Sequence, residues 1–308
     1  MSAKIEPALA TAATPAAAPC ILCGGTRTTP HFSGGGAAQP TSPVSERYRI
    51  THSERRLVQS IVRCVDCGLV TLPLSYAPPV SYEDAADPYY IEQRAQRVAN
   101  AHRLLGLVPS GGRLLEIGCA CGFLLQAARE RGFAAQGVEM SAWASAYARD
   151  ELGLDVRTGT LEAAAFADGQ FDVVVLADVI EHLFDPAATV REIRRVLAPG
   201  GRLLLLTPDV GSPVARLAGP RWWGLLDDHY FYFSRQTLRR LLEREGFAIE
   251  RITALGRVFP LAHWAFKLAP YSRSLERAVS GAIRAVGADQ LQISINLGDQ
   301  MACVAQKK

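Results

Sequence analysis

A repeated alternation of short aliphatic segments with helix-like segments constrains the fold of this chain most strongly. Four aliphatic segments are bounded by glycine or acidic turns, as buried parallel strands are; they span residues 113–118, 134–139, 171–177 and 201–207. Helix-like segments lie between them at residues 122–131, 143–152 and 186–197. This order predicts an α/β fold, a doubly wound and mostly parallel sheet with helices on both faces.

Both flanks of the alternation carry further elements. Residues 73–87 hold three prolines and are typical of a linker, and the pattern becomes helical at Pro88. The stretches 247–255 and 301–308 read as two more strands, separated by a basic, amphipathic helical insertion at about residues 259–287. We expect the insertion to pack on the sheet or to form a dimer contact, while contact with a membrane surface stays open. No apolar run approaches the ~20 residues that cross a bilayer, so we expect a soluble protein without stable membrane insertion.

The first residues of the chain, 1–19, are rich in alanine and proline. They are typical of a disordered tail, because they cannot bury enough apolar surface to offset their ordering entropy. A signal peptide that ends at a lipid-modified Cys20 is the alternative, but Pro19 occupies the cleavage position. We therefore expect a cytoplasmic protein.

Two Cys-x-x-Cys-Gly pairs are formed by Cys20 with Cys23 and by Cys64 with Cys67. Each such turn directs two thiolates at one ion, and four thiolates complete a tetrahedral zinc site. Iron is the alternative metal, and disulfides are disfavoured in a reducing cytosol. Because four protein ligands leave no open position for water, we predict a structural Zn²⁺ in a small zinc-ribbon-like module over residues 20–72.

The segment LEIGCACGFLL places Glu116, Gly118 and Gly122 at the junction between the first strand and the next helix. Glycines let the backbone approach a ligand closely, and the helix N-terminus offers free N–H groups to an anionic part of it. Glu139 ends the second strand, where an acidic side chain can accept both hydroxyls of a ribose. These features together indicate a nucleoside cofactor, although alone they are shared with dinucleotide-binding domains.

Four motifs, in their order and spacing, resemble those of the class I S-adenosylmethionine-dependent methyltransferases. LEIGCACG is similar to the first motif of that family and GVEMS to the second, while FDVVVLADVIEHLFDP and RRVLAPGGRLLLLTP are similar to the fourth and fifth. The resemblance covers about residues 88–255 with the closing strand, in a domain that would extend over residues 88–308. It implies a seven-stranded sheet and S-adenosyl-L-methionine as the cofactor.

The resemblance also implies roles for single residues. Glu116 and Gly118 would lie beside the methionine moiety, and Glu139 would hold the ribose. The segment GTLE, with Thr160 and Leu161, would face the adenine. The remaining implied cofactor contacts are Ala120, Gly122, Met140 and Asp178.

Two positions depart from the family pattern. Ala120 replaces the usual middle glycine, which tightens the loop but still permits a small side chain. Thr160 stands where the family often has an aspartate for the adenine amino group. That contact would then come from Glu162, from a backbone carbonyl or from Thr160 itself.

Methyl transfer from a sulfonium is a direct displacement, in which alignment of the reacting groups supplies much of the rate. A hydroxyl or amine acceptor still gains from a base of near-neutral pKa, usually a histidine. His182 follows a strand at its C-terminal tip, and His229 lies in the aromatic loop WWGLLDDHYFYFS. We predict that both are catalytic; the alternatives are a hydrogen bond to the cofactor loop for His182 and a satisfied core position for His229. Asp178 and Glu181 flank this site and either bind substrate or orient His182.

The net charge of +3 is too mild to indicate nucleic acid as a partner. The aromatic loop at 221–233 favours a small-molecule acceptor, such as a sugar, a nucleotide-sugar or another cell-envelope or polysaccharide intermediate. The acceptor atom and the oligomeric state, including a homodimer, stay open. An RNA methyltransferase that grips RNA with its zinc module is the alternative function, and a non-catalytic S-adenosylmethionine-binding partner protein is a third.

Overall fold

The computed structural model describes residues 19–32, 60–72, 82–83, 85–226, 228–269 and 271–308. The expected N-terminal tail, apart from Pro19, and most of the expected linker lie outside these ranges. So do residues 33–59, between the two cysteine pairs.

A seven-stranded sheet forms the centre of the molecule, in the order β10-β13-β8-β7-β4-β5-β6. Its members are β4 (Gly112–Ile117), β5 (Phe133–Glu139), β6 (Asp155–Thr158), β7 (Phe171–Ala177), β8 (Leu197–Pro208), β10 (Phe247–Ala254) and β13 (Gln300–Lys307). The five strands from β4 to β8 pair in parallel, and β13 lies antiparallel between β8 and β10. The mostly parallel doubly wound fold expected from the sequence is therefore confirmed.

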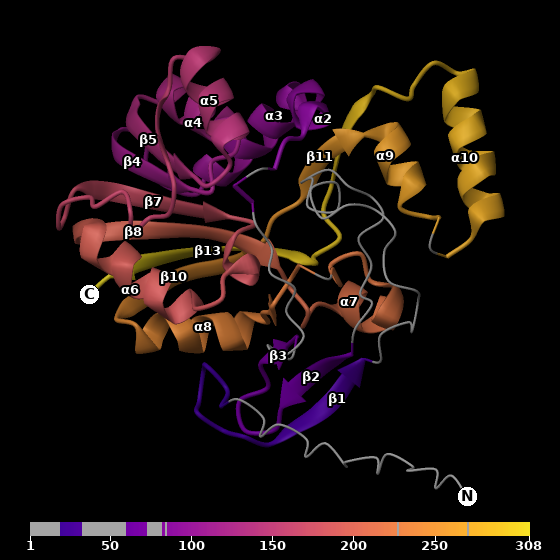
Figure 1. Cartoon of the computed structure of the whole chain (residues 1–308). Helices are drawn as coiled ribbons and strands as arrows, with labels where there is room; N and C mark the ends of the chain where they lie inside the picture. Colours follow the sequence, from indigo (N-terminus) through magenta and orange to yellow (C-terminus); the bar gives the residue numbers. More distant parts are fainter. Residues whose placement is uncertain (1–18, 33–59, 73–81, 84, 227, 270) are drawn as a thin grey trace, which may run out of the picture.

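Helices cover both faces of this sheet (Figure 1). On one face lie α3 (Arg94–Leu105), α4 (Phe123–Glu130) and α5 (Ala142–Asp150), preceded by the short α2 (Pro88–Glu92). On the other lie α6 (Pro186–Val196) and α8 (Arg235–Arg244), whose leucine face is buried. The strand order reverses between β4 and β7, and ligands of open α/β sheets bind at the carboxyl ends of strands at such a point.

A second, four-stranded sheet joins the part of the chain that carries the two cysteine pairs, here called the cysteine module (residues 20–72), to the rest of the chain. Its order is β1-β2-β3-β9, with β1 (Thr28–Phe32), β2 (Ile61–Cys64), β3 (Val70–Thr71) and β9 (Phe231–Tyr232). The Leu72 N–H also donates to the Tyr230 carbonyl at 2.9 Å. Because β9 lies in the aromatic loop that carries His229, the cysteine module holds that loop by backbone pairing.

The insertion before the last strand is longer than the sequence predicts and is not purely helical. It consists of β11 (Arg257–Pro260), α9 (Leu261–Phe266), α10 (Arg273–Ala285) and β12 (Gln292–Ile295), so that a two-stranded ribbon carries two helices. Figure 1 shows α9 and α10 projecting beside the sheet. Among the helices described, none has the length and apolarity needed to cross a membrane.

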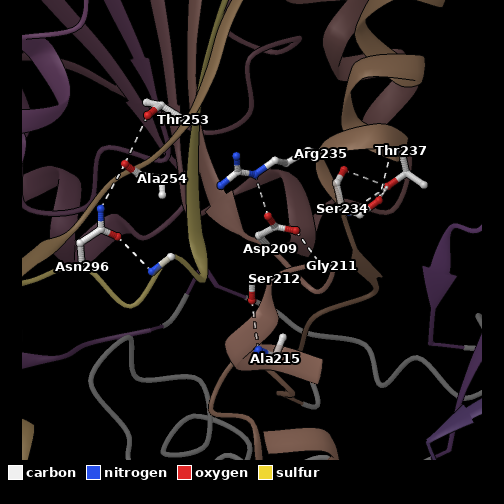
Figure 2. Close-up of polar contacts among 11 residues, drawn as sticks. Asp209, Gly211, Ser212, Ala215, Ser234, Arg235, Thr237, Thr253, Ala254 and Asn296 are labelled. Carbon is white, nitrogen blue, oxygen red and sulfur yellow. Dashed lines mark hydrogen bonds and ion pairs between the residues drawn. The ribbon is translucent and has the colours of Figure 1, made fainter. Parts of the chain in front are cut away.

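Polar contacts fix the loop that follows β8, as Figure 2 shows. The buried Asp209 carboxylate accepts the Gly211 N–H at 2.9 Å and the Arg235 side chain at 3.0 Å. Ser212 caps the short α7 (Pro213–Ala218), and Ser234 caps α8 in a reciprocal capping box with Thr237. These contacts therefore fix the segments on both sides of the aromatic loop.

Candidate active site

The loop between β4 and α4 has the left-handed backbone that its glycines permit. Gly118 has φ of 70° and Gly122, the N-cap of α4, has φ of 81°. A Cβ at Gly118 would lie 2.7 Å from Val179 Cγ2, so a side chain there would clash. The positive φ would also strain the backbone of any residue other than glycine. Ala120 also adopts positive φ, at 46°, a cost that persists only where the surroundings impose it.

Glu139 supplies that constraint. Its carboxylate accepts the Ala120 N–H at 2.8 Å and the Ser141 N–H at 2.8 Å, so it holds the loop from the end of the neighbouring strand. Burial raises the pKa of Glu139 above its ordinary value of 4.5, while these backbone donors lower it. The structure therefore places this acidic side chain against the glycine loop at the point where the strand order reverses.

Glu116 is the second acidic group of this site. It is buried, and no described residue bonds to its Oε2 atom. Burial raises its pKa well above 4.5, and the charge of Glu139 raises it further. A buried carboxyl with an unmatched oxygen fits a cationic ligand group, and S-adenosylmethionine carries both a sulfonium and an ammonium.

A small cavity lies beside the Glu139 carboxyl group. Its lining includes Tyr82, Asp87, Tyr90, Glu139 and Trp143. Aromatic side chains next to an acidic group at the end of a strand suit the base and ribose of a nucleoside.

The other residues with an implied cofactor role differ in exposure. Met140 is half-buried directly after Glu139, and Leu161 is buried in the core. The Thr160 hydroxyl accepts the Ala163 N–H at 3.2 Å and so stabilises a turn. Cys119 and Cys121, which lie within the loop between β4 and α4, are buried among packing residues.

The two histidines singled out from the sequence come together. Their ring centroids are 4.7 Å apart and their planes meet at 81°. His182 ends the short helical turn η2 (Ile180–His182) after β7, and His229 is buried in the aromatic loop. The His229 Nδ1–H donates to the Gly224 carbonyl at 3.0 Å, because a carbonyl can only accept.

Asp228 and Tyr82 orient His182. The His182 Nδ1–H donates to the Asp228 carbonyl at 2.9 Å, and the fully buried Asp228 carboxylate lies 3.6 Å from the same nitrogen. The Tyr82 hydroxyl is 3.1 Å from that nitrogen and 3.4 Å from Asp228 Oδ2. With Nδ1 fixed as the donor, Nε2 of His182 is the nitrogen that can accept a proton, as in a base held by a carboxylate.

Asp178 and Glu181 lie beside this pair with partners of their own. Asp178, at φ 55°, accepts hydrogen bonds from Arg257 and, at 2.6 Å, from Gln300. Glu181 accepts the Thr207 hydroxyl at 3.0 Å, and burial and the charge of Asp178 raise its pKa to about 8. Ligand atoms of Glu181, His182 and His229 all lie within 4.8 Å of one another.

The four cysteines of the two pairs meet at one point. The Sγ atoms of Cys20 and Cys67 are 3.5 Å apart, those of Cys23 and Cys64 are 3.6 Å apart, and all four lie within 4.8 Å of one another. Zinc–sulfur bonds of about 2.3 Å give a tetrahedron with an edge of about 3.8 Å. The observed separations fit that geometry.

Sequence reasoning missed three residues of this site. Asp228 directly precedes His229, so its place in the sequence could have identified it as a site residue. Tyr82 lies in the expected linker, and Arg257 lies at the edge of the insertion. No local pattern marks either of them, because each reaches the site through contacts distant in the chain.

Comparison with known proteins agrees with this geometry. A family model described as a methyltransferase domain matches residues 90–252, which is more than half of the chain. The ubiquinone biosynthesis O-methyltransferase of Pseudomonas aeruginosa is 36% identical over 104 residues, which make up 32% of this chain and 45% of that protein. The enzyme of the same name from Parvibaculum lavamentivorans is 37% identical over 100 residues, 31% of this chain and 40% of that protein. The matched segment thus spans less than half the length of these relatives.

A solved structure shares the fold. It is a Haloferax volcanii methyltransferase in complex with the Trm112 methyltransferase activator, with a TM-score of 0.51 and 18% identity over 71% of this chain and 92% of that one. The chain therefore belongs to the methyltransferase domain family and has the class I fold of that family.

Proposed function

We propose that this enzyme methylates a small-molecule acceptor in the cytoplasm, a sugar, a nucleotide-sugar or another cell-envelope or polysaccharide intermediate. The observation that carries the proposal is the histidine pair at the carboxyl end of β7, where His182 follows the strand and His229 belongs to the aromatic loop. The buried side chains of that loop include Trp222, Tyr230 and Phe231. Such an enclosure suits a compact acceptor from which water must be excluded.

The acceptor atom that fits this site best is a hydroxyl oxygen. His182 Nε2 would take the hydroxyl proton while the oxygen forms its bond to the methyl carbon and the carbon–sulfur bond breaks. The Asp228 carboxylate would stabilise the imidazolium that results. His229, edge-on to His182, is the second candidate for this role. The relatives named above are O-methyltransferases, which supports oxygen as the acceptor.

The cofactor half of the site would be divided among the residues around the glycine loop. S-adenosylmethionine, when bound, supplies an electrophilic methyl group. Glu139 would accept the ribose hydroxyls, and Glu116 would face the cationic methionine end. Gly118, Ala120 and Gly122 would let the backbone approach the ligand. Met140, Thr160, Leu161 and Asp178 would complete the enclosure.

The cysteine cluster would hold a structural Zn²⁺. Support comes from the sulfur separations and from the four thiols, none of which is in a disulfide. A closed site with four thiolates cannot activate water, so it would act by folding the module. Since β3 pairs with β9, the folded module would also hold the aromatic loop over the acceptor.

Label transfer from S-adenosylmethionine to a panel of acceptors tests this function. The panel contains sugars, nucleotide-sugars and bulk ribosomal RNA, and each is run with the wild-type protein and with His182→Gln. We expect transfer to a small molecule, and about a 100-fold to 10,000-fold loss of rate in the variant, which is the usual contribution of a general base. The affinity for S-adenosylmethionine should stay unchanged. Transfer to RNA alone, or an undiminished rate in His182→Gln, contradicts the proposal.

A further inference from the structure

Three basic side chains gather where the insertion meets the acceptor side of the site. Arg257 begins β11, His263 lies on α9, and Lys267 caps that helix one turn later. The Lys267 N–H donates to the His263 carbonyl at 3.2 Å, so the two side chains share one face of the helix. Charges of the same sign repel, so their collection at one place needs a reason.

Part of the hydrogen-bonding capacity of these three groups is unmet within the described chain, although the Arg257 Nη2 group donates to Asp178. Neither an ion pair nor a hydrogen bond joins the Lys267 ammonium to a described residue; it lies 4.3 Å from the centre of the Trp223 ring. His263 Nε2 and Arg257 Nε are buried and have no partner there either. An ammonium has three donors, and leaving buried donors unpaired costs free energy.

The acidic groups around this cluster already have partners, and one of them, Asp178, pairs with Arg257 itself. Asp178 accepts from Arg257 and Gln300, Glu181 accepts from Thr207, and Asp299 accepts the indole N–H groups of Trp222 and Trp223. Burial and the charge of Arg257 together lower the pKa of Lys267 to about 8, while the charge of Asp299 opposes this shift. Burial likewise lowers the pKa of His263 to about 4, with contributions from Lys267 and Arg257. An anion bound among them would relieve this repulsion.

The cluster has a fixed position next to the acceptor site. Asn100 on α3 holds β11 through two bonds with the Val258 backbone, of 2.9 and 2.7 Å. Arg257 reaches Asp178 at the tip of β7, and Lys267 lies on Trp223 of the aromatic loop. The Arg257 and Asp178 side chains remain 27% and 39% exposed, so the cluster opens to solvent.

We propose that Arg257, His263 and Lys267 bind a phosphate group of the acceptor. A phosphate offers several acceptor oxygens, which matches the Lys267 ammonium, the unpartnered Arg257 Nε–H and the His263 imidazole better than the two oxygens of a carboxylate do. That the phosphate belongs to the acceptor rests on the proposed function. The binding site itself rests only on the cluster.

Binding of inorganic phosphate to the full chain, followed by phosphorus NMR without S-adenosylmethionine, tests the site. We expect Lys267→Met to weaken binding by about tenfold or more, since a charged hydrogen bond is lost. Lys267→Arg should retain binding. The matched control Lys308→Met removes an exposed lysine beyond the opposite end of β13, and it should bind like the wild-type protein.

The thermal midpoint separates a ligand site from a structural one. Removing a buried, unpaired charge does not destabilise a protein, so Lys267→Met should melt no lower than the wild-type protein in phosphate-free buffer. Equal phosphate affinity in the wild-type protein and Lys267→Met overturns the proposal. Acetate that competes as strongly as phosphate would also overturn the proposal, because the site would then bind anions in general.

Two phosphate sources can then be compared with the same variants. Uridine diphosphate represents soluble nucleotide-linked acceptors, and phosphatidylglycerol vesicles represent lipid-linked ones. If one of these probes binds and Lys267→Met weakens that binding, the result supports the site and identifies the source of the phosphate. If neither probe binds, the proposal is overturned. If the protein binds phosphate but not S-adenosylmethionine, the proposed function is refuted and the phosphate site stands. If it binds S-adenosylmethionine but not phosphate, only the phosphate site is refuted.

Discussion

Replacing Glu116 by glutamine should change how stability depends on pH. The folded-state pKa of Glu116 is raised well above 4.5, chiefly by burial, so the folded protein keeps a proton that the unfolded chain releases. Its contribution to stability is present below about pH 4.5 and is lost as pH rises through the folded pKa, by at most about 1.4 kcal/mol per pH unit. Glutamine mimics the protonated form, so Glu116→Gln should remove this loss and be more stable at neutral pH.

Urea unfolding between pH 5 and 8 measures this difference, with the ligand-free wild-type protein and Glu116→Gln side by side. The raised pKa values of Glu139 and Glu181 contribute in both proteins, so the difference between the two slopes isolates Glu116. A cationic ligand should ionise Glu116, so binding of S-adenosylmethionine should release a proton and tighten by up to about tenfold per pH unit below the folded pKa. Equal slopes in the two proteins, or binding without proton release, would refute the reasoning.

Three further outcomes follow from the structure. Glu139→Ala should weaken S-adenosylmethionine binding by about a hundredfold or more, since two hydrogen bonds to a charged group are lost; retained affinity in calorimetry would overturn the ribose assignment. Gly118→Ala should lower the free energy of unfolding by more than ~1 kcal/mol, because φ is 70° and Val179 Cγ2 is 2.7 Å from the new Cβ; an unchanged urea midpoint would contradict this. The purified chain should carry about one equivalent of zinc, and a chelator should lower its thermal midpoint; much less metal would exclude the zinc site.

The sequence predicts the centre of the fold well because the signals there are local. The aliphatic run at 171–177 coincides with β7, and the helix-like segment at 186–197 agrees with α6 to within one residue. By contrast, β6 went unpredicted: it is a short edge strand of the sequence DVRT with one buried residue, so it has little apolar pattern. The ribbon of β11 and β12 was missed because its two strands are separated by two helices.

The same contrast between local sequence patterns and long-range contacts applies to the site. The sequence singles out His182 because it follows a strand and His229 because it lies in the aromatic loop, and the structure brings the two rings together. Their orientation was not predictable, because Tyr82 and Asp228 reach His182 through the tertiary fold. Asp178 was expected at the cofactor, yet its carboxylate is held by Arg257 and Gln300, and only a three-dimensional structure shows such long-range pairing.

A calorimetric titration of the purified protein with S-adenosylmethionine, S-adenosylhomocysteine and NAD tests the central claim most directly. Glu139 against the glycine loop and the unmatched oxygen of Glu116 predict binding of the first two ligands and no binding of NAD. Binding of NAD, or of none of the three, would contradict the assignment of this loop to S-adenosylmethionine.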